Sequence, residues 1–156
     1  MRLFWLNASI IFLLDRITKY LILKAEFEKI KILPILDIVK VWNKGIAFGI
    51  FSKPRTFAIL ILILITGIVL VFAYIWAKKI SSRTPEDKIS LIALGMLFGG
   101  GMGNLADRIL FGKVLDFLDL HINSFHWPAF NLADAAITFS LFLLFYKTFK
   151  NKSFKK

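Results

Sequence analysis

The chain has 156 residues, no cysteine, a hydrophobic fraction of 58% and a net charge of +11, with a mean hydropathy of +0.71. The lack of cysteine excludes a disulfide framework and thiolate chemistry. A soluble domain of this length has too little interior for so much apolar side chain, so we predict one membrane-embedded domain over residues 1–156. Most basic residues flank apolar runs and form no stripe interleaved with aromatic residues. We therefore expect membrane lipids, and not nucleic acid, as the partner of this charge.

Four apolar segments are each long enough to cross a bilayer, which takes about 20 helical residues. They cover residues 3–23, 57–77, 89–109 and 129–146. Runs of this length predict helices, so the fold class that we expect is an integral membrane, all-α bundle of four transmembrane helices. No small-x-small cleavage site follows the first segment within reach, so it is interpreted as an uncleaved span.

The density of Lys and Arg predicts the orientation of the spans. With the N-terminus inside, the inner pieces 1–2, 78–88 and 147–156 hold ten basic residues in 23 positions. The outer pieces 24–56 and 111–128 hold eight in 51 positions. We therefore predict both termini in the cytoplasm, with 147–156 as a solvated basic tail.

The first outer segment, 24–56, contains two β-prone runs, Glu28–Ile32 and Asp37–Trp42, followed by turn residues at Asn43–Gly45. This pattern predicts a small sheet on the outer membrane surface after the first helix. Residues 112–121 of the second outer loop, 111–128, also have an extended pattern. Ordinary amphipathic loops are the alternative for both.

In this topology the polar residues of the spans all lie near the outer boundary. Asp15 and Lys19 are four residues apart on one helix face and are expected to pair, whereas Asp15 and Arg16 are expected to face different ways. The other polar candidates are Asn43, Asn104, Arg108, Asp116, Asn131 and Asp134. Gly100 forms one helix stripe with Asn104 and Arg108, because the three are spaced by four. Charged groups at membrane depth are costly and usually mark a functional site, so we predict one site here.

The glycine ladder Gly95, Gly99 and Gly103 favours close approach of another helix. For Gly95 packing is the preferred interpretation. For Gly99 and Gly103 a substrate groove beside exposed backbone is left as an equal alternative.

Asp116 and Asp134 are the candidates for chemistry, because two nearby carboxylates in a site of low dielectric constant share one proton. The ionised member can then take a proton from water while the protonated member polarises a carbonyl. Spacing alone leaves a structural Asp–Lys or Asp–Arg pair open. Asp119 is a rival that we expect on a solvated face, and Asp107 is expected to pair with Arg108 or to cap the site.

His121 and His126 are the only histidines, and a metal site formed by them with aspartates is disfavoured because no H-E-x-x-H or i, i+4 His pair is present. No Ser–His arrangement for nucleophilic catalysis is evident, and no His–Asp pair lies within a span. A lipid hydrolase or acyltransferase is disfavoured for that reason.

Five motifs in order give the chain a resemblance to the bacterial lipoprotein signal peptidases, the signal peptidase II family. They are DRITK (15–19), NKGIAFG (43–49), GGGMGNLADR (99–108), VLDF (114–117) and FNLADAAI (130–137). The resemblance implies an intramembrane aspartyl endopeptidase of the bacterial cytoplasmic (inner) membrane, with its site near the outer leaflet. Its substrates would be prolipoproteins, cut just before the diacylglyceryl-modified cysteine of the lipobox.

The same resemblance assigns roles to residues. Asp116 and Asp134 would be the catalytic pair, Asn104 and Arg108 would hold the substrate backbone, and Asn131 would orient the pair. Asp15, Lys19, Asn43, Gly45, Gly100 and Gly103 would support the site, and Asn43–Gly49 would act as a lid. The sheet would be a cradle for the lipidated substrate. No metal or organic cofactor is implied, and a monomer is expected. The alternative from another class is a non-enzymatic membrane scaffold or transporter subunit.

Overall fold

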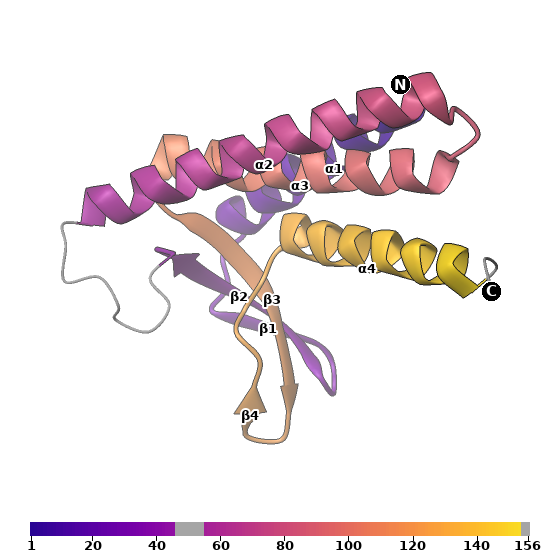
Figure 1. Cartoon of the computed structure of the whole chain (residues 1–156). Helices are drawn as coiled ribbons and strands as arrows, with labels where there is room; N and C mark the ends of the chain where they lie inside the picture. Colours follow the sequence, from indigo (N-terminus) through magenta and orange to yellow (C-terminus); the bar gives the residue numbers. More distant parts are fainter. Residues whose placement is uncertain (46–54, 154–156) are drawn as a thin grey trace.

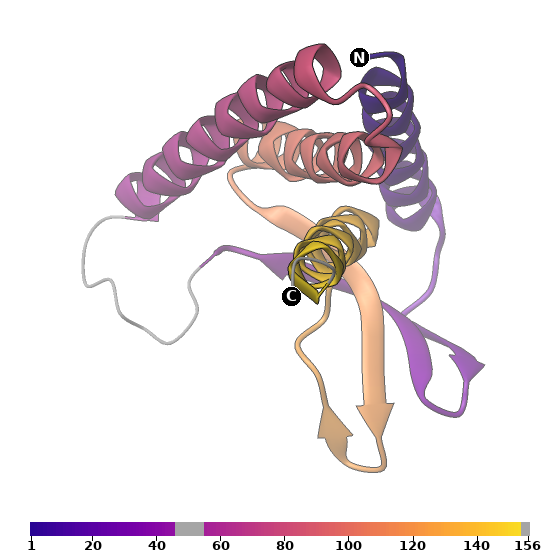
Figure 2. The same cartoon turned by 45° about the vertical axis from the view of Figure 1, so that its right-hand side comes forward.

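The computed structural model describes residues 1–45 and 55–153, which contain four helices and one small antiparallel sheet. The helices are α1 (Arg2–Lys24), α2 (Arg55–Arg83), α3 (Lys88–Phe111) and α4 (Leu132–Ser153). Helix α3 is central: it packs against α1, α2 and α4, and the sheet lies on the same side as α4 (Figures 1 and 2). The helices therefore form the scaffold from which the sheet projects.

Three of the four helices are long and apolar enough to cross a membrane within the described residues. These stretches are Thr56–Arg83, Lys88–Phe111 and Leu132–Lys150. Helix α1 is not among them, and it carries Asp15, Arg16 and Lys19 in its second half. The architecture therefore fits a multi-pass membrane protein with at least three spanning helices.

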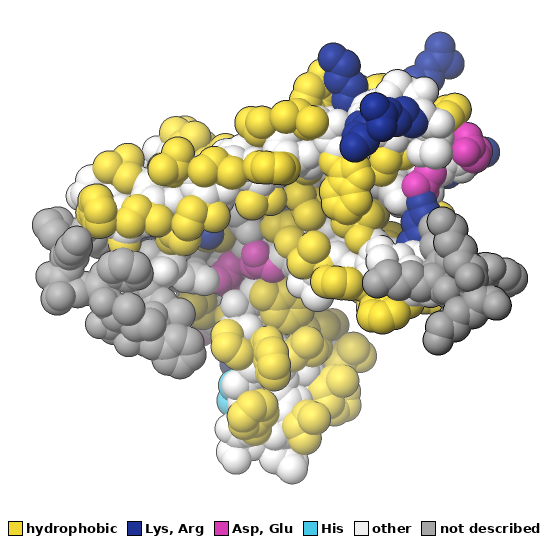
Figure 3. Space-filling view, viewed as in Figure 1, with side chains coloured by type: hydrophobic (Ala, Val, Ile, Leu, Met, Phe, Trp, Pro, Cys, Tyr) yellow, Lys and Arg dark blue, Asp and Glu magenta, His cyan; other side chains and the backbone are white. Residues whose placement is uncertain are grey.

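One end of the bundle, here called the basic end, is built from helix termini. The Met1 amino group donates to Ser81 Oγ at 2.6 Å, and Lys147 Nζ donates to Ser90 Oγ at 2.9 Å and pairs with Asp87. Asp87 also caps α3 by accepting from the Ser90 amide at 3.1 Å. These contacts bring the start of α1, the end of α2, the start of α3 and the end of α4 together, and Figure 3 shows basic side chains there.

The contacts at the basic end explain two differences from the predicted boundaries. Helix α2 continues to Arg83, beyond the predicted residue 77, and α4 continues to Ser153 where a solvated tail was predicted from residue 147. Over 147–153 the predicted tail is helical and Lys147 binds across to α3, while Thr148, Phe149 and Lys150 are exposed. At its other end α4 begins at Leu132 and not at residue 129.

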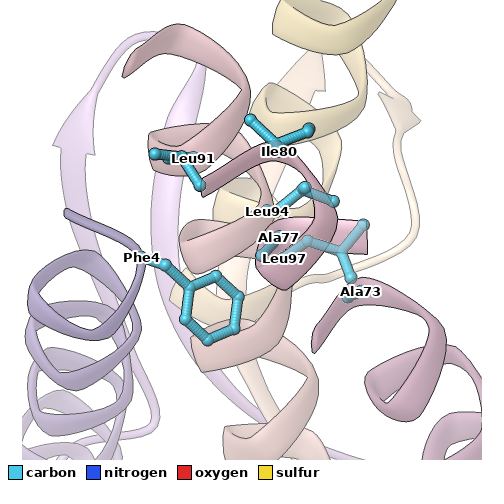
Figure 4. Close-up of a cluster of buried hydrophobic side chains, with 7 residues drawn as sticks. All are labelled: Phe4, Ala73, Ala77, Ile80, Leu91, Leu94 and Leu97. Carbon is cyan, nitrogen blue, oxygen red and sulfur yellow. The ribbon is translucent and has the colours of Figure 1, made fainter. Parts of the chain in front are cut away.

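Near the basic end the helices share an apolar core. Figure 4 shows its buried members, which come from α1, α2 and α3: Phe4, Ala73, Ala77, Ile80, Leu91, Leu94 and Leu97. The Phe4 ring packs edge-on against Phe98 with centroids 5.3 Å apart. Elsewhere large apolar side chains are exposed, as Phe72 and Phe142 are, and the helices have a mostly apolar outer surface in Figure 3. Such a surface suits lipid as the surrounding solvent.

The glycine ladder of α3 packs against α1. A Cβ atom on Gly95 or Gly99 would collide with the backbone oxygen of Phe4 or Ala8, and one on Gly103 would lie 2.5 Å from Asp15 Oδ2. The structure therefore supports packing at all three positions. Gly100 faces α4, where an added Cβ would lie 2.7 Å from the Ala133 oxygen.

The sheet joins both segments that were expected to be extended. Its strands, in the order β1-β2-β3-β4, are β1 (Lys29–Leu33), β2 (Leu36–Asn43), β3 (Val114–Ile122) and β4 (Phe125–His126), all paired antiparallel. The sheet predicted after the first helix is present, and the second loop adds β3 and β4 to it. Val41 pairs with Asp116 and Asn43 with Val114, so the β2–β3 pairing brings Asn43 beside Asp116.

The predicted turn after β2 begins as expected. Gly45 has a φ of +70°, and its amide donates to Asn43 Oδ1 at 2.8 Å. The rest of the Asn43–Gly49 segment, for which the resemblance implied a lid, lies outside the described residues.

Candidate active site

Asp134 lies in the first turn of α4, where hydrogen bonds with Asn131 fix both its backbone and its carboxylate. The Asp134 amide donates to Asn131 Oδ1 at 3.0 Å, and the Asn131 amide donates back to Asp134 Oδ2 at 3.2 Å. This reciprocal pair is a capping box, which satisfies two backbone donors that a helix start would otherwise leave unpaired. The Asp134 carboxylate is therefore fixed at the N-terminal end of α4.

Asp116 lies in β3 and is 2% exposed. Asn43 Nδ2 donates to Asp116 Oδ2 at 2.9 Å, and Asn131 Nδ2 donates to Asp116 Oδ1 at 2.7 Å. Asn131 is thus hydrogen-bonded to both carboxylates: to Asp134 through its backbone amide and to Asp116 through its side chain. One fully buried amide residue links the two candidates for chemistry.

Asn104 of α3 supports the pair from the other side. Its Nδ2 donates to Asp134 Oδ1 at 2.7 Å, while its Oδ1 accepts from Lys19 Nζ at 3.0 Å and from Asn131 Nδ2 at 3.1 Å. Both oxygens of each carboxylate therefore accept a hydrogen bond from an asparagine. The carboxylate orientations are set by neighbours that are themselves hydrogen-bonded.

Behind this network lies an ionic cluster of four side chains: Asp15, Arg16, Lys19 and Asp107. Lys19 Nζ lies 3.0 Å from Asp15 Oδ2 and 2.8 Å from Asp107 Oδ2. Arg16 bridges the same two carboxylates at 2.8 and 2.7 Å. Two positive and two negative charges balance, which limits the cost of burying them.

The cluster confirms one sequence prediction and corrects two. Asp15 and Lys19 pair as expected. Asp15 and Arg16 also pair, because the long guanidinium side chain reaches back to its neighbour's carboxylate, so the prediction that they face apart is wrong. Asp107 pairs with Arg16 and Lys19 of α1 and not with Arg108, because it lies on the helix face that contacts α1.

The electrostatic environment disfavours a second negative charge at the site. Burial, and then the charge of Asp134, raise the pKa of Asp116 from 3.8 to about 6, against the hydrogen bonds from Asn43 and Asn131. Arg108 lies close enough to act electrostatically on Asp134 and Asp116, and its Nη1 donates to the Asn104 backbone oxygen at 3.4 Å. Asp116 therefore retains its proton to a higher pH than a free carboxyl group does.

A groove of about 740 Å³ leads to Asp134. Its other lining residues are mostly apolar and come from β3, the segment before α4, and α4 itself: Leu120, Trp127, Pro128, Ala129, Phe130, Ala135, Thr138, Phe139 and Phe142. Figure 3 shows carboxylate side chains in the hollow between the helices and the sheet. The geometry offers an apolar ligand direct access to one carboxylate of the pair.

The rival residues form two neighbouring His–Asp pairs on the sheet, and the His121 and His126 rings stack with centroids 5.0 Å apart. His121 Nε2 is 2.9 Å from Asp37 Oδ2, and His126 Nδ1 is 2.9 Å from Asp119. The side chain of Asp119 is only 13% exposed, so the expectation of a solvated face is wrong: it turns to His126. Over residues 1–45 and 55–153 no three His, Asp or Glu side chains are grouped as metal ligands.

The structure brings most of the predicted site residues into one hydrogen-bonded network: Asp15, Lys19, Asn43, Asn104, Arg108, Asp116, Asn131 and Asp134. Gly100 and Gly103 lie at helix contacts beside it, and Gly45 forms the turn after Asn43. Sequence reasoning missed Arg16 as a member and named Arg108 as the partner of Asp107 in place of Arg16 and Lys19. Asp107 stands in the charged stretch at the end of α3. Which helix face it lies on determines whether it pairs with Arg108 or with residues of α1.

Comparison with known proteins gives a consistent result. The family model for signal peptidase (SPase) II matches residues 7–150. The lipoprotein signal peptidase of Aquifex aeolicus is 39% identical over 152 residues, covering 95% of this chain and 88% of that one. The enzyme of the same name from Thermodesulfovibrio yellowstonii is 38% identical and covers 93% of each chain.

Two solved structures of bacterial membrane enzymes, determined by the in meso method, share the fold. One at 2.3 Å resolution has a TM-score of 0.80 and 30% identity, covering 97% of this chain and 90% of that chain. The other, at 1.9 Å, has a TM-score of 0.78 and 28% identity, covering 92% and 90%. With the family model matching nearly its whole length, the chain belongs to the signal peptidase II family.

Proposed function

We propose that this protein removes the signal peptides of prolipoproteins, with Asp116 and Asp134 as an aspartyl catalytic pair. The observation that carries the proposal is the position of Asn131, which is hydrogen-bonded to both carboxylates while Asp134 lines an apolar groove. The expected substrate is a prolipoprotein whose lipobox cysteine carries a diacylglyceryl group, and the cleaved bond is the one just before that cysteine.

In the proposed mechanism one carboxylate of the pair is ionised and the other is protonated. The ionised member takes a proton from a water molecule, whose oxygen attacks the scissile carbonyl carbon. The protonated member donates its hydrogen to the carbonyl oxygen, and a gem-diol forms. Collapse of the gem-diol breaks the C–N bond: the protonated carboxyl gives its proton to the leaving nitrogen, and the ionised carboxylate takes one from a gem-diol hydroxyl, which restores the pair with one shared proton. The products are a carboxylic acid and a free cysteine amino group.

Neighbouring side chains contribute by holding this geometry. Asn43, Asn104 and Asn131 donate to the carboxylates and restrict their rotation. Arg108 and Asn104 lie beside the pair and are assigned to the substrate backbone, where the Arg108 charge would stabilise the developing negative oxygen. The apolar groove is assigned to the acyl chains and apolar signal residues of the substrate.

The proposed membrane placement follows the charge distribution. The basic end and both chain termini face the cytoplasm of a bacterial cell. The site lies near the outer leaflet of the cytoplasmic membrane. Helix α1 forms the fourth span. Its charged residues can lie at membrane depth because they are neutralised within the protein. We expect the protein to act as a monomer.

The test is cleavage of a diacylglyceryl-modified lipobox peptide by the purified protein in detergent, with and without a chelator. Wild type and the Asp119→Asn variant should cleave, because Asp119 pairs with His126 away from the network. Asp134→Asn and Asp116→Asn should fold and lose at least ~10³-fold in activity, because each removes a proton-transfer group.

Three outcomes would contradict parts of the proposal. Substantial cleavage by purified Asp134→Asn or Asp116→Asn would exclude the carboxylate pair as the catalytic group. Chelator-sensitive cleavage would make His121 and His126 candidates for metal binding. No cleavage by folded wild type would favour a non-enzymatic scaffold or transporter subunit.

A further inference from the structure

The ionic cluster contacts the backbone immediately before each carboxylate of the pair. Asp107 Oδ2 accepts a hydrogen bond from the amide of Leu115, the residue before Asp116, at 3.4 Å. Asp15 Oδ1 accepts from the amide of Ala133, the residue before Asp134, at 3.2 Å. The two carboxylates of one cluster thus hold equivalent backbone positions on two elements that are far apart in the sequence.

Both backbone contacts are buried, and each gives a backbone amide a hydrogen-bond acceptor. Asp15, Asp107, Leu115 and Ala133 are each at most 2% exposed. The Ala133 amide belongs to the first turn of α4, where no helix carbonyl is available to it. An amide left without an acceptor in such a place is costly, so these bonds restrict the backbone.

Arg16 and Lys19 connect the two anchors to each other. Each cation contacts both Asp15 and Asp107, so the oxygens that hold Ala133 and Leu115 belong to one rigid, charge-balanced unit. Lys19 also donates to Asn104, which bonds to Asp134 directly. A shift of one anchor is therefore transmitted to the other.

We infer that Asp15 and Asp107 are positioning residues that set the separation of Asp116 and Asp134 by tying the preceding backbone amides to a common ionic cluster. Neither residue touches the reacting carboxylates through its own side chain. The catalytic part of this inference rests on the proposed function, and its structural part does not. A competing explanation is that the cluster only neutralises charges buried among the helices.

The experiment compares alanine and asparagine variants of the full-length protein in detergent, using amide hydrogen exchange resolved at Leu115 and Ala133 together with kcat and KM. Asp107→Ala should speed exchange at Leu115 more than at Ala133, and Asp15→Ala should do the reverse. Each should lower kcat by about 100-fold with KM changed less than threefold, because displacement of a catalytic group by about 1 Å has this effect. Asp107→Asn and Asp15→Asn should recover part of kcat, because their side-chain oxygen can still accept from the amide.

A second variant covers the case in which an unpaired buried cation prevents folding. The double variant Asp107→Ala with Arg16→Ala removes one charge of each sign and leaves Asp15 paired with Lys19. It should fold, exchange quickly at Leu115 and cleave slowly. Fast cleavage by this variant, or unchanged exchange at Leu115, would overturn the inference in favour of simple charge neutralisation.

Asp87→Asn is the matched control, since it weakens an ion pair with Lys147 and the cap of α3 at the basic end. It should lower thermal stability without altering kcat or exchange at Leu115 and Ala133. Failure of wild type to cleave would contradict the proposed function, whereas the exchange pattern would still decide the positioning role.

Discussion

The two halves of α3 are buried by different means. From Lys88 to Phe98 the helix presents Leu91, Leu94 and Leu97 to an apolar core shared with α1 and α2. From Gly99 to Phe111 it presents glycines, Asn104 and Asp107, and its neighbours are charged side chains and backbone. One helix therefore combines an apolar half that assembles the bundle with a polar half that builds the site.

The comparison shows that the two halves tolerate change differently. Between helices in lipid the apolar contacts stabilise mainly by close packing, so loss of a methyl group leaves a void but no unpaired group. In the polar half each side chain has partners that become unsatisfied when it moves, and a buried unpaired charge is costly. Substitutions in the polar half should therefore affect activity most, and those in the apolar half should affect stability.

Among the substitutions that compare the two halves of α3, the largest effect is expected from Gly103→Ala. The new methyl carbon would lie 2.5 Å from Asp15 Oδ2, so the Asp15 carboxylate would have to move from its place between Lys19 and the Ala133 amide. We predict a loss of about 100-fold in kcat for cleavage of the lipobox peptide, because Asp134 shifts with its backbone.

Gly67→Ala in α2 provides the control, because nothing lies within 4 Å of the position of an added Cβ there. It should leave kcat unchanged and stabilise α2 by up to about 1 kcal/mol through higher helix propensity. Equal activity of the two variants would show that the Gly103 contact with Asp15 does not position the site.

The apolar half is tested by Leu94→Ala. Leu94 is 1% exposed, and its truncation should lower the stability of the protein by about 2–4 kcal/mol through lost packing. The remaining folded enzyme should keep its kcat within about twofold, since no hydrogen bond of the site depends on this side chain. The measurements are thermal unfolding in detergent and activity well below the midpoint.

Leu64→Ala is the matched substitution on an exposed face, where Leu64 is 63% exposed. Its midpoint should change little. A loss of activity in Leu94→Ala at temperatures where the protein stays folded would contradict the separation of the two halves.

The same division explains what sequence reasoning could predict. Long apolar runs specify helices directly, and the spacing of Asp15 and Lys19 specifies their pairing, since both depend on local geometry. The partner of Asp107 depends on which face of α3 meets α1. Asp107 lies on that face, whereas the adjacent Arg108 does not. Periodicity did not resolve this choice.

The joined sheet is the other feature that local patterns could not supply. The pairing of Val41 with Asp116 connects segments 75 positions apart, and nothing in either strand specifies the other. The capping box at Asn131 and Asp134 was readable in principle, because an Asn followed three residues later by an acidic side chain is a helix-start pattern. Its role in orienting a catalytic carboxylate required the contact from Asn131 to Asp116.

The smallest effect concerns the pH dependence of stability, and it comes from Asp116 in β3, which Asn131 links to Asn104 in the polar half of α3. The pKa of Asp116 is raised from 3.8 to about 6, mainly by burial and then by the Asp134 charge, so the folded protein favours the protonated form. Its stabilising contribution is therefore complete below pH 3.8 and is lost as the pH rises through about 6. Between pH 5 and pH 7 wild type should lose about 1 kcal/mol relative to Asp116→Asn, which has no proton to release at this position. Thermal midpoints of both proteins in detergent at pH 5, 6 and 7 measure this difference. A difference that stays constant over the range would show that Asp116 is ionised throughout and that the pair does not share a proton through this residue.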